Sequence, residues 1–225
     1  MKKYILAAAI LAALACGKEK PVEVTSMVIV HTSGDAVVVK KGQTEAARTG
    51  LLVHEADEIR TRVGSVDLQT RGGSAVRVKE NTTMTVAQLL GRGDARLSLK
   101  QGSLLASVKK SSADEEFAIV TPTAIAGVRG TTFSVSVNQA GQKPVVKVID
   151  GKVALSPRIA VLENLEEQTI KEDTGLQQLA QVQETTVVLE AGQQGSLNPA
   201  VEQRISQINQ ELTEESNTTR LVQVA

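Results

Sequence analysis

The chain has 225 residues, with 25 lysines and arginines balanced by 25 aspartates and glutamates, and aromatic residues make up 1% of it. The lack of a strong basic field argues against nucleic acid as a partner, and the scarcity of aromatic side chains argues against stacking platforms for bases or sugars. A single cysteine excludes an internal disulfide, and the length suits one domain with an appendage.

The first fifteen residues have the layout of a secretory signal peptide. Lys2 and Lys3 form a basic start, and an apolar run from Ile5 to Leu14 follows them. This run is too short to cross a bilayer core of about 30 Å, which needs about 20 helical residues. A basic start, a short apolar middle and small residues before a break are typical of exported chains, so residues 1–15 are predicted to be a signal peptide.

Cys16 follows Ala13-Leu14-Ala15 and resembles the lipobox of bacterial lipoproteins, although Ala13 stands where the lipobox usually has leucine. In a lipobox the thiol is alkylated by a diacylglycerol and the chain is cut just before it. Two or more acyl chains anchor a protein stably to a membrane. We therefore predict a covalent lipid on Cys16, no other cofactor, and a tether over residues 16–25. The mature net charge is then near −2, because Lys2 and Lys3 are lost. An ordinary signal peptide with an incidental cysteine is the alternative.

Residues 26–196 alternate short β-branched runs with glycine and polar clusters, which is typical of an all-β domain. A turn is predicted at Ser33-Gly34-Asp35, and a hairpin turn at Arg71-Gly72-Gly73-Ser74. The strands predicted in this part lie at 28–30, 37–39, 64–70, 75–78, 83–86, 95–99 and 104–109.

Asp150-Gly151 lies between two alternating runs within residues 143–155. This dipeptide predicts a hairpin with a type I′ turn, because both central positions tolerate positive φ. Residues 133–137 are predicted to pair with this hairpin, since Phe133 shares one face with every second residue that follows. The fold class predicted from these strands is all-β, an antiparallel β-sandwich or β-roll of short strands with a short C-terminal helix.

The sequence changes character after residue 157. Leucine and valine at roughly helical spacing among Glu and Gln predict a helical or irregular insertion at about 157–185, before a last strand at 187–189. Residues 197–225 are predicted to be an amphipathic helix and tail, because Asn198-Pro199 is a helix-start signal. The helix packs on the sheet or docks a partner. Its apolar stripe is Val201, Ile205, Ile208 and Leu212.

The residues that could carry catalysis or bind a metal are few. The chain has two histidines, His31 and His54, and the segment 54–58 (His-Glu-Ala-Asp-Glu) gathers four possible ligands. In a strand these side chains alternate between faces, so a metal site is not favoured over solvated charges. The sequence has no nucleophile elbow, phosphate loop or dinucleotide fingerprint, and we therefore predict a protein that is not an enzyme.

The segment TPTAIAGVRGTTFSVSV at residues 121–137 resembles the hallmark segment of the FecR domain family. Further segments resemble other parts of that family over about residues 30–196. They are Gly34-Asp35-Ala36-Val37, Asp57-Glu58-Ile59-Arg60-Thr61, Glu80-Asn81-Thr82, Lys100-Gln101-Gly102-Ser103-Leu104, Asp150-Gly151-Lys152-Val153 and Leu189-Glu190-Ala191-Gly192-Gln193. The family-motif residues, with a structural or a ligand-contact role, are Thr121, Pro122, Gly127, Arg129, Gly130, Thr131 and Phe133.

The resemblance implies an extracytoplasmic all-β domain. The best-known members are inner-membrane regulators that pass an iron-siderophore receptor signal to a sigma factor, with a transmembrane helix ahead of the domain. No later stretch of this sequence is apolar enough to span a membrane, so it is more similar to lipid-anchored FecR-domain proteins. We expect a cell-envelope lipoprotein that acts as a non-catalytic binding or scaffold module. Its partners are expected to be the membrane, through the lipid, and another envelope or surface protein or a glycan. A sensor of the FecR type is the first alternative and an envelope enzyme the second. Gly17 replaces the aspartate that retains some lipoproteins in the inner membrane, which favours the outer membrane.

Arg129 is a permanent cation within a run that is otherwise small, β-branched or apolar. One explanation is structural: the guanidinium braces loop carbonyls or a carboxylate such as Asp57 or Asp150, because a buried charge must be paired. The other is functional: the same fork of donors binds a carboxylate or phosphate of a ligand.

Overall fold

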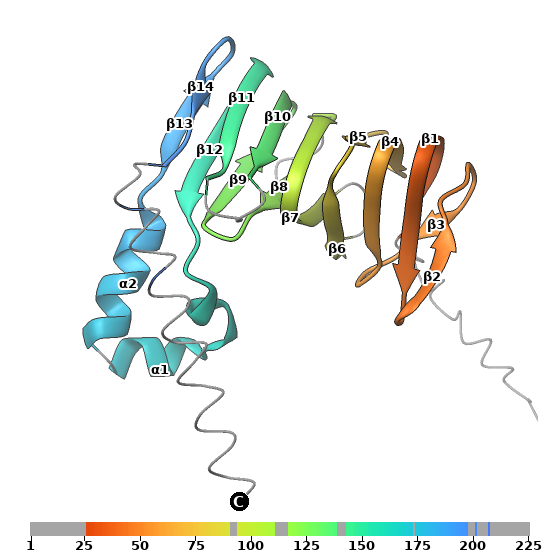
Figure 1. Ribbon diagram of the computed structural model, residues 1–225. Coiled ribbons are helices and arrows are strands. Elements are labelled where there is room, and N and C mark those ends of the chain that lie inside the picture. The colour runs from red at the N-terminus through yellow and green to blue at the C-terminus, as the bar shows by residue number, and fades with distance from the viewer. Residues whose placement is uncertain are drawn as a thin grey trace, which may run out of the picture.

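The computed structural model describes residues 26–90, 94–110, 117–138, 143–172 and 174–197, together with the single positions Val201 and Gln207. Its fourteen strands are hydrogen-bonded into one continuous sheet, which confirms the all-β prediction. Neighbouring strands are antiparallel, with the exception of the parallel pair β7–β8. Figure 1 shows the strands side by side in a row, from β1–β3 at one end to β13 and β14 at the other.

The strand pairings divide the sheet into two layers. Layer A contains, in spatial order, β2 (Gln43–Ala46), the second half of β1 (Met27–Lys40), the start of β4 (Glu58–Thr70), β6 (Thr83–Leu90), the first half of β7 (Asp94–Ser107), β8 (Phe117–Val120), β9 (Ala124–Val128), β12 (Lys152–Pro157) and β13 (Val187–Glu190). Layer B contains β3 (Leu52–Val53), the first half of β1, the end of β4, β5 (Ala75–Val78), the second half of β7, β10 (Thr132–Val137), β11 (Val145–Asp150) and β14 (Gln194–Gly195).

Three long strands, β1, β4 and β7, bend and run through both layers. In β7, Leu97 and Leu99 are buried in layer A, whereas Leu104 and Ala106 are buried in layer B. The buried positions thus change from odd to even numbers at the bend, beside Gly102, whose φ is +93°. A strand that crosses from one layer to the other must make this change in order to keep its apolar side chains between the layers.

The bends in β1 and β4 lie next to each other. Gly34 and Gly64 are direct partners in the β1–β4 ladder, and the register shifts there. The predicted turn at 33–35 is therefore wrong: β1 continues through this point as one bent strand. A glycine between two polar residues is compatible with a chain reversal and with a bend. The local sequence does not show that the two halves of β1 lie in different layers.

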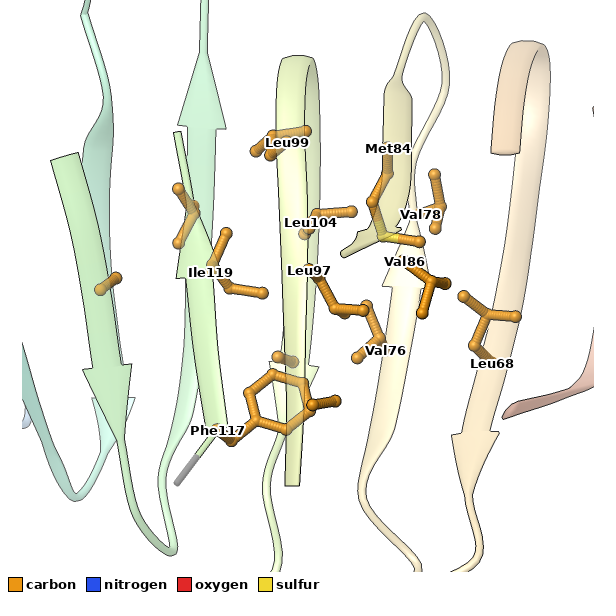
Figure 2. Close-up of a cluster of buried hydrophobic side chains, with 14 of the residues drawn as sticks. Leu68, Val76, Val78, Met84, Val86, Leu97, Leu99, Leu104, Phe117 and Ile119 are labelled. Atoms are coloured by element: carbon orange, nitrogen blue, oxygen red, sulfur yellow. The ribbon is translucent and has the colours of Figure 1, made fainter. Parts of the chain in front are cut away.

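The core lies between the layers and is made of aliphatic side chains and the two phenylalanines. Figure 2 shows one part of it, where Leu68, Val76 and Leu104 from layer B meet Met84, Leu97 and Phe117 from layer A. Burying one such side chain stabilises a fold by about 1.5–3 kcal/mol, so the apolar contacts between layers A and B are the main source of stability.

Two predicted pairings are confirmed and one is wrong. β4 and β5 form the hairpin around residues 71–74, and β10 pairs with β11. The Asp150-Gly151 hairpin does not exist, because β11 pairs with β10 and β14 whereas β12 pairs with β9 and β13. Asp150-Gly151 instead carries the chain from layer B to layer A. A hairpin and a crossing between layers have the same alternating strands and the same turn residues. They differ only in which strands pair.

Helices follow the last residues of β12 and lie beside the β13–β14 end of the row (Figure 1). They are a 3-10 turn η1 (Ala160–Asn164), α1 (Glu167–Glu172) and α2 (Thr174–Glu184). Val201 and Gln207 are helical, whereas the other stripe residues of the predicted C-terminal helix, and Cys16, lie outside the described residues. Within the described part of the chain, no helix combines the length and apolar character needed to cross a bilayer.

Candidate functional site

The residues of the hallmark segment do not meet in one place. β9 separates Thr121 and Pro122 from Arg129 and Gly130, and a five-residue strand spans about 13 Å between its first and last residues. We call the side of the domain that contains the three strand bends the bend edge, and the opposite side the loop edge. Pairing of β8 with the first half of β7 places Thr121 at the bend edge. Pairing of β10 with β7, Thr132 opposite Ser107, places Arg129 at the loop edge.

At the bend edge, Thr121 closes the turn between β8 and β9. Its hydroxyl donates to the carbonyl of Ala124 over 2.8 Å and accepts the amide of Ala124 at 2.9 Å. Arg158 donates its backbone amide to Thr123 and its guanidinium to the carbonyl of Thr121 at 3.3 Å. The same guanidinium holds both carboxylate oxygens of Glu163, at 3.0 and 2.7 Å. This end of the hallmark segment therefore attaches the helical appendage to the sheet.

At both edges, buried threonine hydroxyls form hydrogen bonds between segments that cross from one layer to the other, whether these are strand bends or loops. Thr61 accepts the amide of Thr82 at 3.0 Å, and Thr82 in turn accepts the amide of Ser103 at 2.9 Å. At the loop edge, Thr131 accepts the amide of Lys152 at 3.4 Å and donates to its carbonyl over 2.9 Å. Each pair is 21 residues apart. Thr61, Thr82 and Thr131 are at most 5% exposed, so their hydroxyls are largely shielded from water.

The residue before each amide donor has a positive φ: Asn81 at 52°, Gly102 at 93° and Gly151 at 86°. A Cβ on Gly102 would lie 2.3 Å from the hydroxyl of Thr82, and one on Gly151 would lie 2.8 Å from that of Thr131. The motifs Glu80-Asn81-Thr82, Gln101-Gly102-Ser103 and Asp150-Gly151-Lys152 are thus one structural device used three times. Gly130-Thr131 belongs to it, and Phe133, fully buried, fills the core beside it.

Arg129 is exposed, so the expectation that its guanidinium is buried is wrong. Its carbonyl accepts the hydroxyl of Thr131 at 3.2 Å, which is a backbone role open to any residue. Asp57 is excluded as its partner, because the order β4, β6, β7, β8, β9 in layer A separates them by about four strand spacings, or roughly 19 Å. Asp57 instead accepts the amide of His54 at 2.9 Å. Gly127, inside β9, pairs with Ala118 and Ala154.

Arg129 lies beside other cations at the loop edge. Lys109 donates its amide to the hydroxyl of Ser74 at 3.0 Å, which places it next to the turn that contains Arg71. Lys110 follows, and its Cβ lies 2.9 Å from where a Cβ on Gly130 would stand. The result is a row of four exposed cations from three connections, which we call the basic edge: Arg71, Lys109, Lys110 and Arg129.

The sequence alone did not indicate the basic edge, because its members are 58 positions apart at the extremes and the chain is neutral overall. Lys109-Lys110 and Arg129 are each unremarkable locally. The strand pairing β5–β7–β10 brings their connections to the same side of the domain. The next residues along the chain, 111–116, include Asp114, Glu115 and Glu116 and lie outside the described residues.

Two ion pairs on the outward faces are well formed. Arg77 donates to both oxygens of Asp67 at 2.7 Å, and these bonds lower the pKa of Asp67 against the opposing effect of burial. Burial raises the pKa of Glu58, but hydrogen bonds from Lys100 and Arg60 outweigh it, so the net shift is downward. Both carboxyls are therefore ionised and paired, which suits a structural role more than proton transfer.

The histidines are not brought into one site. His31 lies opposite Asp67 on the exposed face of layer B, and His54 lies in the turn before β4. Among the residues that the structure describes, no group of three His, Cys, Asp or Glu side chains is arranged to hold a metal ion. The possible ligands in 54–58 have other partners: Glu55, for example, accepts the amide of Leu89 at 2.6 Å.

Residues 57–154 match the family model described as FecR protein, a narrower span than residues 30–196. The resemblance seen in the sequence is thereby confirmed. Two crystal structures of "a putative anti-sigma factor" from Parabacteroides distasonis ATCC 8503 are similar to the chain, each with a TM-score of 0.46 and 18% identity. The similarity covers 63% of this chain and 55% of theirs, so the chain matches only about half the length of those proteins. A comparison with curated proteins found no match.

Proposed function

Because residues 57–154 carry a FecR domain, we propose that this protein is a bacterial cell-envelope lipoprotein that binds an acidic surface of another envelope protein through its basic edge. The observation that carries the proposal is the row of four exposed cations presented by a rigid sheet, with Arg129 of the hallmark segment among them. FecR-family proteins are associated with the envelope, which supports the location.

The match supports a sensor or regulator kind of role in the envelope and points to a family that is not enzymatic. Binding without catalysis agrees with the paired carboxylates and the separated histidines. At the loop edge, the hydroxyl of Ser74 accepts the amide of Lys109, and the hydroxyl of Thr131 bonds the backbone of Lys152, so the connections that carry Arg71, Lys109 and Arg129 are tied to their neighbours. A fixed row of charges increases both the rate and the specificity of association with an oppositely charged surface.

Anchoring is proposed to depend on Cys16. Cells expressing the full chain and fed radiolabelled palmitate should label the wild type, and Cys16→Ser should lose both the label and the membrane fraction. Equal labelling of the two would show that the cysteine is not the lipid site. Separation of the inner and outer membranes on a density gradient then tests the proposed outer-membrane location.

Partner binding is tested by crosslinking in intact cells followed by mass spectrometry. The variant Lys110→Glu/Arg129→Glu reverses two charges of the basic edge. The matched control, Arg62→Glu/Lys79→Glu, reverses two exposed charges at the bend edge. A protein captured by the wild type and the control but lost from the first variant would support the proposal. Identical crosslinks in all three proteins would show that the contact does not lie at the basic edge. Binding to purified anionic glycan, with no protein captured, would show that the partner is a glycan.

A second candidate function is a FecR-type sensor coupled to iron-siderophore signalling, favoured by the domain match itself. It differs in the partner that it requires. Capture of a TonB-dependent receptor in the same crosslinking experiment, with dependence on iron supply, would support the sensor over the scaffold.

A further inference from the structure

Among the residues that the structure describes, β13 has a strand partner on one side only, which leaves its other side open, and its sequence is apolar. Its residues Val187, Val188, Leu189 and Glu190 pair with β12 on one side, and β13 is the last strand of layer A at that end of the row (Figure 1). Val187 and Val188 are 45% and 55% exposed. An edge of this kind is a template for pairing with another strand, and natural proteins usually protect such edges with charges, proline or short length.

The other edge strands of the described sheet have such protection. β3 and β14 contain only two residues each. β2 has the polar sequence Gln43-Thr44-Glu45-Ala46. β13 is thus the one described edge strand with three successive apolar residues, and its only charge is Glu190.

The backbone of Val188 faces the open side. The amide of Glu190 donates to the side-chain oxygen of Gln193 at 2.8 Å, so this amide points away from β12. Backbone groups two residues apart in a strand point in the same direction, and the amide and carbonyl of Val188 therefore also point to the open side.

The charges near the edge do not oppose self-association. Glu190 forms an ion pair with Lys152 at 2.7 Å, on the neighbouring strand. This pairing offsets the negative charge that the end of β13 would otherwise present to a second strand. The edge is therefore self-complementary: apolar in its centre and neutral at its end.

We propose that β13 pairs with β13 of a second copy of this chain, antiparallel, about a two-fold axis at Val188. The register follows from the direction of the backbone groups: Val188 exchanges two hydrogen bonds with its symmetry mate, and Val187 lies opposite the mate's Leu189. Layer A then continues from one copy into the other. α2 lies beyond one end of β13 (Figure 1), so in an antiparallel pair the two α2 helices lie at opposite ends and do not collide.

Cysteine crosslinking tests the register. In the full chain carrying Cys16→Ser, the substitution Val188→Cys places two thiols on residues whose Cα atoms are about 5.5 Å apart across the axis, within disulfide range. Ala154→Cys is the matched control, since Ala154 is exposed and lies directly beside Val188 on β12. Its two copies would be about 15 Å apart, which is too far for a disulfide.

Val188→Cys should give at least about tenfold more crosslinked dimer than Ala154→Cys under mild oxidation. Equal yields, whether both high or both low, would overturn the proposal. Sedimentation velocity gives a second readout on the full chain: Val188→Lys should weaken self-association about tenfold or more. Leu52→Lys, at the opposite end of the row and 45% exposed, should leave it unchanged. A monomeric wild type whose β13 binds an unrelated extended peptide would also overturn pairing with a second copy.

Discussion

The hydroxyl of Thr131 donates to the carbonyl of Lys152 over 2.9 Å and accepts the amide of the same residue at 3.4 Å. These bonds join the connection β9–β10 to the connection β11–β12 at the loop edge. Thr82 and Ser103 are related in the same way at the bend edge, where the amide of Ser103 lies 2.9 Å from the hydroxyl of Thr82. The motif therefore serves to align successive crossings between the two layers, and its loss should be measurable as stability.

Thr131→Val should lower the free energy of unfolding by about 1–3 kcal/mol, because it removes the hydroxyl partner of the part-buried backbone amide and carbonyl of Lys152. For a domain of this size that corresponds to a fall in Tm of about 2–12 °C. Thr131→Ser keeps the hydroxyl, so its free energy of unfolding should fall much less. Thermal unfolding followed by circular dichroism measures all three, and equal midpoints for Val and wild type would show that the bond contributes little.

Gly102→Ala should be among the most destabilising single-methyl changes in the chain. The new Cβ would lie 2.3 Å from the hydroxyl of Thr82, in a backbone with φ of +93°. Overpacking costs about 1–3 kcal/mol, and the left-handed backbone adds about 1–2 kcal/mol for a residue other than glycine. Gly42→Ala is the matched control, with φ of +80° and no atom within 4 Å, and it should lose only the backbone part. Urea unfolding of the two variants separates the terms; a similar loss in both would mean that the contact relaxes freely.

Arg129→Ala should change stability by less than about 1 kcal/mol, because the side chain is exposed and surface ion pairs contribute little. The Tm should therefore move by less than about 4 °C. The same variant should weaken capture of the acidic partner. A fall in Tm of about ten degrees would instead show that the guanidinium stabilises the fold.

The pair of Asp67 and Arg77 predicts a particular pH dependence. The pKa of Asp67 is lower in the folded state, so the stability it contributes is fully present above the unfolded pKa of about 3.9 and is lost as pH falls through the folded value. Arg77→Gln should thus be less stable than wild type near pH 7, and the difference should shrink progressively below about pH 4. Chemical unfolding across this range checks it, with Lys147→Gln, an exposed cation on β11 of the same layer, as the control. A difference that stays constant with pH would contradict the linkage.

Part of the fold was predictable from local pattern. Alternation identified the hairpin β4–β5 and the partner strands β10 and β11, and the segment 121–137 indicated the FecR domain. One further signal was present in the sequence but not used: the apolar phase of β7 changes from Leu97 and Leu99 to Leu104. A change of phase within one strand indicates a bend between layers.

The candidate site was less predictable, for a physical reason that Arg129 illustrates. Whether a cation is buried depends on which face of which layer its connection reaches, and that depends on strand pairs far apart in sequence. The row of Arg71, Lys109, Lys110 and Arg129 exists because β5, β7 and β10 are neighbours. No local pattern contains that information.

The sequence by itself determined the strand content, the aliphatic core, the hallmark segment and the cysteine that we propose to be lipidated, because each depends on residue type and short-range periodicity. The tertiary structure alone decided that Asp150-Gly151 crosses between layers, that Thr131 bonds Lys152, and that Arg129 is exposed. These features depend on strand partners, and a strand's partners are selected by the burial of the whole sheet, which no single segment encodes.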